Sequence, residues 1–184
     1  MRVKKNIVKC KCFLLLIFLL CSVDIYSQRV AVKTNGLYWL TLSPNIGGEF
    51  VLSDHLSLDV GVAFNPFRIS DLQLKFVQVQ PELRYWFGRP MSQHYVGITA
   101  FYADNKSRFK DNMYYGDSFA GGVTYGYAWI LGKRWNLEAF AGIGYLHYRQ
   151  FKYPAGGIRP GRPNKKGGTV APVKFGVSIV YIIR

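Results

Sequence analysis

The stretch Val173-Lys174-Phe175-Gly176-Val177-Ser178-Ile179-Val180-Tyr181, close to the end of this 184-residue chain, decides the fold class. Its odd-numbered residues are apolar or aromatic, whereas Lys174, Gly176 and Ser178 fall on the opposite side. A period of two along such a stretch is what an extended strand requires when its two faces meet different environments. The stretch therefore predicts a β-strand with one apolar face, formed by Val173, Phe175, Val177, Ile179 and Tyr181.

The offsets between Lys174, Gly176, Ile179 and Tyr181 resemble the C-terminal sorting signal that directs bacterial outer-membrane β-barrels to the barrel-assembly machinery. In that signal the aromatic residue is terminal, whereas here Ile182-Ile183-Arg184 follow Tyr181. The resemblance implies an outer-membrane location.

The beginning of the chain predicts export. Five basic residues precede an apolar run from Phe13 to Leu20. This pattern is typical of a secretory signal peptide, and the run is too short to span a bilayer. We expect cleavage after Ser27, so that residues 1–27 form the signal peptide and residues 28–184 the barrel domain. Lipidation at Cys21 is the alternative, although a small residue is expected before a lipidated Cys and Leu20 is large.

The composition agrees with an exported chain. All three Cys residues, Cys10, Cys12 and Cys21, lie in or beside the leader, which leaves the mature chain without disulfide or thiolate chemistry. The leader also holds five of the 24 basic residues and one of the 10 acidic ones, so 19 basic and 9 acidic residues remain, a net charge of +10. This balance favours anionic glycolipid or polysaccharide partners over nucleic acid.

Alternation recurs along the chain and predicts eight strands, at residues 31–42, 45–53, 55–64, 76–87, 93–103, 117–131, 134–148 and 169–183. Most have the roughly 9–11 residues that a tilted membrane strand needs. The connections after the second, fourth and sixth strands are short. Those after the third, fifth and seventh (65–75, 104–116 and 149–168) are long, and only the first outer connection, Ser43-Pro44, is tight.

Short turns on one side and long loops on the other are typical of outer-membrane barrels. We therefore predict an all-β fold, an eight-stranded antiparallel transmembrane β-barrel after an N-terminal signal peptide, with both termini periplasmic. Pro81 falls inside a predicted strand, where it removes a ladder hydrogen bond, and we expect a bulge there. Aromatic residues near the strand ends, Trp86 among them, are expected to form girdles at the membrane boundaries.

The face opposite the apolar one combines many Gly and Ala residues with one or two charges per strand, which suits the crowded interior of a narrow barrel. Buried charges need partners. We therefore predict a structural charge network in the lumen, formed by Lys33, Glu49, Asp59, Glu82, Arg84, Glu138 and Lys174. Conduction is not expected, because side chains fill the interior of an eight-stranded barrel.

Four ordered motifs resemble a family of small outer-membrane proteins labelled only as domain of unknown function 3575. The motifs are residues 33–39 (KTNGLYW), residues 44–50 (PNIGGEF), Asn65-Pro66-Phe67, and residues 80–87 (QPELRYWF). The resemblance implies an eight-stranded barrel of the OmpA or OmpX type and no established activity. It also implies a possible link to fimbrial or other surface components.

A catalytic site is not expected. His55, Ser57 and Asp59 alternate and would share the inward face of one strand, as a nucleophile, base and acid would. We interpret them as a turn residue followed by lumen-facing polar residues, because His55 falls at the periplasmic end, away from the outer-leaflet lipid A. Neither metal-ligand spacing nor a cofactor motif is found, so we predict no metal and no cofactor. Two alternatives stay open, namely a lipid A-modifying barrel enzyme and a soluble lipocalin-like periplasmic carrier.

The fourth outer loop, residues 149–168, is the best candidate for binding. It has no acidic residue, and its Pro and Gly content predicts a loop without a packed core. Its cations are suited to phosphate or carboxylate groups of lipopolysaccharide or capsule. They are Arg149, Lys152, Arg159, Arg162, Lys165 and Lys166. The alternative is that these charges are merely solvated.

Overall fold

The structure, a computed structural model, describes residues 29–65, 68–69, 72–109, 112–154 and 165–183. The predicted signal peptide, the alternative lipidation site Cys21, and the loop cations Arg159 and Arg162 lie outside the described residues.

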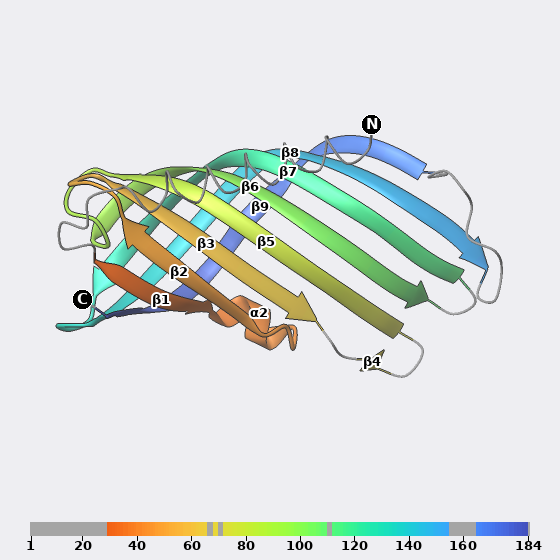
Figure 1. Cartoon of the computed structure of the whole chain (residues 1–184), viewed down its shortest axis with the longest axis horizontal. Helices are drawn as coiled ribbons and strands as arrows, with labels where there is room; N and C mark the ends of the chain where they lie inside the picture. The colour runs from red at the N-terminus through yellow and green to blue at the C-terminus, as the bar shows by residue number, and fades with distance from the viewer. Residues whose placement is uncertain (1–28, 66–67, 70–71, 110–111, 155–164, 184) are drawn as a thin grey trace, which may run out of the picture.

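Eight antiparallel strands close into a barrel (Figure 1). In spatial order β3, β2, β1, β9, β8, β7, β6 and β5 are neighbours, and the pairing of β3 with β5 completes the ring. The strands are β1 (Val30–Asn35), β2 (Asn45–Val51), β3 (Leu56–Asn65), β5 (Leu72–Trp86), β6 (Gln93–Phe109), β7 (Asn112–Ile130), β8 (Trp135–Pro154) and β9 (Lys165–Ile182). A two-residue strand, β4 (Arg68–Ile69), pairs with the start of β5. The predicted all-β, eight-stranded antiparallel barrel is confirmed.

Both ends of the described chain lie at one end of the barrel, which we call the terminal end. The backbone N–H of Ile183 donates to Val30 O at 2.8 Å, so the last residues of β9 pair beside the start of β1. The tight connections β2–β3, β5–β6 and β7–β8 lie at the same end. The opposite end, where β3, β6 and β8 finish, is called the loop end.

The wall of the barrel has unequal height. The strands β1, β2 and β3 have 6, 7 and 10 residues, whereas β5 to β9 have 15 to 20 and extend well beyond them at the loop end (Figure 1). The predicted long loops were therefore too long: β7 and β8 keep one register from Ile130↔Asn136 to Asn112↔Pro154. Pairing continues because ladder hydrogen bonds do not depend on the apolar alternation that defined the predicted strand ends.

The predicted first strand, 31–42, is wrong beyond Asn35. A short helix, α2 (Gly36–Leu40), follows β1, and the Asn35 side chain caps it by accepting a hydrogen bond from Leu37 N at 3.0 Å. The expected tight connection at Ser43-Pro44 is thus a helix followed by a turn. No helix among the described residues is long and apolar enough to cross a membrane.

The two faces of the wall follow the predicted parity, with one exception. Phe175, Val177 and Ile179 are exposed on the outside, whereas Val173 is buried. The reason is a β-bulge: Gly142 pairs with Lys174 and Ile143 with Pro172, so Val173 is an extra residue in β9.

The bulge expected at Pro81 is absent. The pairs Val79↔Tyr102 and Glu82↔Thr99, on either side of Pro81, belong to one unbroken register between β5 and β6. Pro81 also pairs regularly with Val60 of β3. The Thr99 hydroxyl donates to Pro81 O at 3.1 Å, so a side chain occupies the acceptor at this point of the ladder.

Candidate functional site: the lumen of the barrel

The seven charged residues predicted for the lumen all lie in one buried cluster, which we call the lumen cluster. Six strands contribute to it: β1, β2, β3, β5, β8 and β9. Its members are Lys33, Glu49, Asp59, Glu82, Arg84, Glu138 and Lys174, of which Lys174, at 11% side-chain exposure, is the most accessible. The period-two pattern put these residues on the inward face, and closure of the barrel brings them together.

Arg84 is the centre of the lumen cluster and is completely buried. Its guanidinium contacts four carboxylates: Nη1 lies 2.9 Å from Glu49 Oε2 and 3.1 Å from Glu138 Oε2, Nη2 lies 2.9 Å from Asp59 Oδ2, and Nε lies 2.7 Å from Glu82 Oε2. The planar fork of five donors lets one arginine bridge acceptors on several strands.

The two lysines flank Arg84. Lys33 Nζ is bonded to Glu49 Oε2 and lies 3.2 Å from Glu138 Oε2 and 3.4 Å from Asp59 Oδ1. Lys174 Nζ lies 2.8 Å from Asp59 Oδ2 and 2.7 Å from Glu82 Oε2. Each carboxylate of the cluster therefore contacts Arg84 and at least one lysine.

The charges of the lumen cluster do not balance. Three cations face four carboxylates, so the cluster has a formal charge of −1. Glu138 Oε1 is buried without a hydrogen-bond partner, and Asp59 Oδ1 has only the Lys33 contact at 3.4 Å. The atoms of the cluster with the fewest partners are therefore carboxylate oxygens, which carry the excess negative charge.

Neutral side chains that the sequence did not single out hold the carboxylates in place. Ser57 donates to Glu49 Oε1 at 2.5 Å and accepts from Trp86 Nε1 at 2.8 Å, and Thr124 donates to Glu82 Oε1. Trp86 is fully buried, so its predicted place in an aromatic girdle is wrong. Its even number, shared with the inward residues Glu82 and Arg84, was the signal for this position.

The lumen is filled between the cluster and the terminal end. Trp86 and Tyr95 pack at 4.6 Å between ring centroids, and Arg84 lies 4.4 Å above the Tyr95 ring. Further down, the β5–β6 turn folds inward and buries Met91 against Ala31 and Val180. This layer closes the terminal end with apolar side chains.

Asn136 anchors that turn. Its Nδ2 donates to Met91 O at 2.6 Å, while Met91 adopts a positive φ of 63°. Ile182 packs against the apolar cluster of Ala31, Met91 and Val180. A residue that follows Tyr181, the last position of the sorting-like motif, therefore has a structural role.

Above the lumen cluster, towards the loop end, the interior is hollow. A cavity of about 60 Å³ lies directly against Lys33, Asp59 and Arg84. A second cavity, of about 250 Å³, extends from there between α2 and β9. The second cavity is lined by Asn35, Leu37, Tyr38, Thr41, Gln78, Phe101, Pro172, Val173, Lys174 and Phe175.

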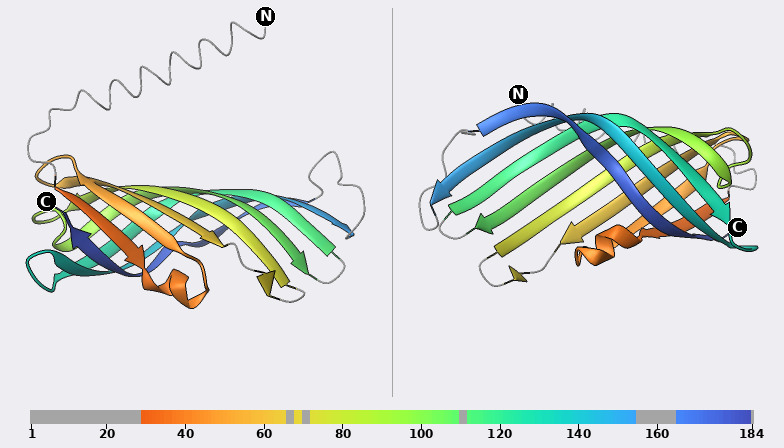
Figure 2. Two further views of the ribbon diagram at one scale, coloured as in Figure 1. Left: turned by 60° about the horizontal axis from the view of Figure 1, so that its bottom comes forward. Right: turned by 180° about the vertical axis from the view of Figure 1, so that it is seen from behind.

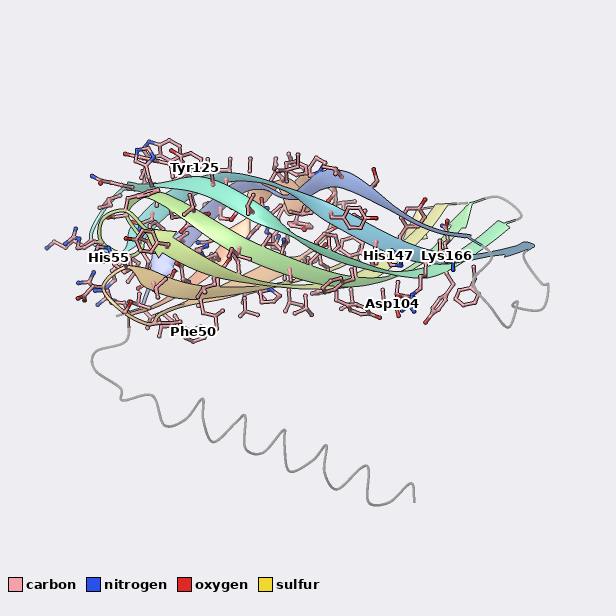
Figure 3. All side chains as sticks on the ribbon, turned by 90° about the horizontal axis from the view of Figure 1, so that it is seen from above. Phe50, His55, Asp104, Tyr125, His147 and Lys166 are labelled. Carbon is pink, nitrogen blue, oxygen red and sulfur yellow. The ribbon has the colours of Figure 1, made fainter. Side chains whose placement is uncertain are left out.

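His55, Ser57 and Asp59 do not form a common site. Ser57 and Asp59 are buried in the lumen, whereas His55 is exposed in the β2–β3 turn at the terminal end (Figure 3). Its Nδ1 lies 3.1 Å from Trp86 O and 3.0 Å from Gly88 O, and its ring stacks on Tyr85. Among the described residues, no group of His, Cys, Asp and Glu side chains is arranged to hold a metal ion.

The predicted basic loop is mostly strand where the structure describes it. Arg149 and Lys152 belong to β8, Lys165 and Lys166 belong to β9, and the register places Arg149 opposite Lys166. Arg149 is paired on the surface, because its Nη2 lies 2.6 Å from Asp117 Oδ2. Lys166 is exposed near the loop end (Figure 3).

The outside of the barrel carries an apolar belt between two aromatic bands. Near the terminal end, Trp135 packs on Tyr181 and Trp129 on Tyr127, both with ring centroids 4.8 Å apart. The second band, towards the loop end, consists of the exposed rings of Phe64, Tyr102, Phe119 and Tyr145. In β8 the belt runs over residues 135–145, and polar residues such as Arg149 follow it.

Comparisons with known proteins agree with the motifs in the sequence. Neither the comparison with curated proteins nor the comparison with solved structures found a match. A family model described as "Protein of unknown function (DUF3575)" matches residues 13–183, which is nearly the whole chain. The chain therefore belongs to the DUF3575 family.

Proposed function

We propose that this protein is a bacterial outer-membrane barrel with both termini in the periplasm. Its role in the envelope is structural, adhesive or interactive rather than catalytic. The observation that carries the proposal is the combination of an apolar outside and a charged inside. Leu83, Val123 and Phe175 are exposed, whereas Glu49, Arg84 and Glu138 are completely buried.

The dimensions of the belt support insertion in a membrane. A tilted membrane strand needs roughly 9–11 residues, and the belt on β8 covers residues 135–145. Aromatic side chains border the belt at both ends, as amphipathic rings do at membrane–water boundaries. A lipocalin-like carrier has the opposite arrangement, with its apolar face directed into a ligand cavity.

The filled part of the lumen, from the lumen cluster to the terminal end, supports a role without conduction. The lumen cluster, the Trp86–Tyr95 pair and the inward β5–β6 turn lie one after another along the barrel. Ser57 is buried and already bonded to Glu49 and Trp86, which speaks against a nucleophile that meets lipid A.

The partners in this proposal are outer-membrane lipid and lipopolysaccharide. The basic residues within 149–166 would contact the phosphates of lipopolysaccharide. The barrel-assembly machinery would insert the barrel into the membrane. Lys166 is a better candidate than Arg149, since Arg149 is paired with Asp117. Neutralising all six basic residues should weaken binding to purified lipopolysaccharide. Unchanged binding would leave these charges with a purely solvating role.

Location and topology are tested together by an epitope tag inserted within residues 155–164. Antibody should reach the tag on intact cells, and the protein should fractionate with the outer membrane and migrate faster in gels before heating than after it. Recovery in the soluble periplasm would refute the proposal in favour of the carrier. Altered acyl chains in the lipid A of a deletion strain would instead favour an enzyme.

A further inference from the structure

The seam between β1 and β9 is incomplete. β1 pairs with β9 only from Ala31↔Ile182 to Asn35↔Ser178, because Asn35 ends the strand and caps α2. β9 continues to Lys165 with β8 on its other side (Figure 2). No described strand pairs with residues 165–177 of β9 along the edge that faces α2.

Two backbone carbonyls of this edge are bonded to side chains instead of to a strand. Near the end of β9, the backbone N–H of Ile182 donates to Arg134 O of the β7–β8 turn, and that of Ile183 donates to Val30 O of β1. The backbone groups of odd-numbered residues therefore point towards β1. The next odd-numbered carbonyls meet side-chain amides: Asn35 Nδ2 donates to Phe175 O at 3.3 Å, and Gln80 Nε2 donates to Val173 O at 3.0 Å. Pro172 has no N–H to offer. Between Pro172 and Phe175, the edge therefore offers few free groups to another strand.

A cavity of about 250 Å³ lies at this seam. Its lining includes the inward residues Phe101, Gln78 and Val173, and also Phe175, whose side chain is 62% exposed on the outer apolar belt. Leu37 and Tyr38 of α2 form its other side. Residues of both faces of the wall therefore line the cavity.

The polar groups around the cavity are bonded to one another. Tyr38 donates to Gln78 Oε1 at 3.3 Å, Gln78 Nε2 donates to Gln80 Oε1 at 3.1 Å, and Thr41 donates to Tyr38 O at 2.9 Å. Lys174, at the inner end, is held by Asp59 and Glu82 in a cluster that already has an excess of negative charge. An anionic head group would find no unpaired cation there to bind. An apolar chain would bind without breaking any of the hydrogen bonds between these polar groups.

The helix beside the opening is itself suited to the membrane. α2 and the turn after it expose Trp39, Leu40 and Leu42, with Leu40 80% exposed, and Trp39 Nε1 donates to the hydroxyl of Thr34 in β1 at 2.8 Å. These apolar side chains belong to the same short segment as Leu37 and Tyr38, which line the cavity. A hydrocarbon chain that lies along the belt at Phe175 would pass beside α2, and the polar side chains of Gln78 and Lys174 that it meets there already have partners.

We propose that the seam between α2 and β9 is a lateral opening through which one acyl chain of a membrane lipid enters the lumen cavity. Its head group stays in the outer leaflet. A cavity of this volume is below the range that holds a drug-sized ligand, which fits one chain end and no whole lipid. This inference rests on the proposed insertion in the outer membrane and adds a lipid-binding site to it.

The test uses the full mature chain refolded into phosphatidylcholine vesicles that contain a lipid with a photoreactive diazirine at the end of one acyl chain. After irradiation, cross-links are mapped by peptide mass spectrometry. We expect adducts at the outward residues Phe175 and Val177 and also at the inward residues Phe101 and Val173. Tyr95, inward but beyond the lumen cluster, should carry none.

Filling the cavity with Val173→Trp should abolish the Phe101 adduct, while the matched outward change Val177→Trp should leave it intact. Both variants are checked for folding by heat-dependent gel migration. If Val173→Trp does not fold, the presence or absence of adducts at Phe101 and Val173 in the unmodified chain is the test. Adducts confined to Phe175, Val177 and other outward residues would overturn the lateral opening while supporting membrane insertion. A refolded chain with no adduct on the belt would instead refute the insertion itself.

Discussion

Replacing Arg84 with Met is the sharpest test of what holds the lumen together. Methionine keeps much of the length of the side chain and removes the charge that contacts Glu49, Asp59, Glu82 and Glu138. The change leaves two lysines against four buried carboxylates, so the formal charge of the lumen cluster goes from −1 to −2.

The magnitude follows from the contacts that remain. Removing one partner of a buried ion pair costs roughly 3–5 kcal/mol. Arg84 has four partners, but Lys33 still contacts Glu49, Asp59 and Glu138, and Lys174 still contacts Asp59 and Glu82. We therefore expect a loss of about 4 kcal/mol in the free energy of unfolding rather than a multiple of it.

The measurement is urea unfolding of the refolded barrel in vesicles, followed by tryptophan fluorescence. With a slope of roughly 1–3 kcal/mol per molar urea, the midpoint should fall by about 2 M. Arg84→Met combined with Glu138→Gln restores the charge of −1 and should recover about 1–2 kcal/mol of the loss. If the single variant lies within about 1 kcal/mol of the unmodified protein, the cluster does not stabilise the barrel as argued.

Three further changes test neighbouring parts of the structure. Glu138→Gln alone should change stability by less than about 1 kcal/mol in the urea assay, because it removes the excess charge at a carboxylate whose Oε1 is already unpartnered; a loss as large as that of Arg84→Met would contradict the charge count. Gly176→Ala should lower the urea midpoint, since its Cβ would collide with the Asn35 amide at a φ of +157°, whereas Gly48→Ala, where the nearest atom is 3.5 Å away, should not; equal effects would show that Asn35 is not held tightly at the seam. Asn136→Leu removes the 2.6 Å bond to Met91 O and should speed protease cleavage within residues 88–92 without a comparable change at the β7–β8 turn; unchanged cleavage would mean that apolar packing alone holds the β5–β6 turn.

The closed sheet and the inward charges could be predicted from the sequence because both depend on a period of two. Parity alone placed Lys33, Glu82, Arg84 and Lys174 on the inward face. Closure of the eight-stranded barrel then brings these side chains together in the lumen, where they form ion pairs. The same parity applied to Trp86 would have placed it inside, but its position at a strand end suggested a girdle.

The unpredicted features depend on where the pattern is interrupted. Residues 36–40 form an apolar run without alternation, and the structure makes them a helical turn with Asn35 as its N-cap and Thr41 as its C-cap. The bulge at Val173 inserts one residue and reverses parity on one side of it, and its only local signal is the neighbouring Pro172, the kind of signal that wrongly predicted a bulge at Pro81. The loop-end strands extend further than expected because backbone pairing persists after the apolar alternation has stopped.

The lumen cluster and the incomplete seam are consequences of the same short strand. β1 has six residues and pairs with β9 over only five of them, so the barrel is closed there by few ladder hydrogen bonds. Lys33 of β1 compensates through ion pairs to Glu49 of β2, Asp59 of β3 and Glu138 of β8, which tie the short wall to the long wall across the lumen. A longer β1 would make these bridges less necessary and would also cover β9 as far as Val173, where the cavity of about 250 Å³ adjoins the free edge of β9. The buried charges therefore hold the short wall at the height where β1 no longer pairs with β9.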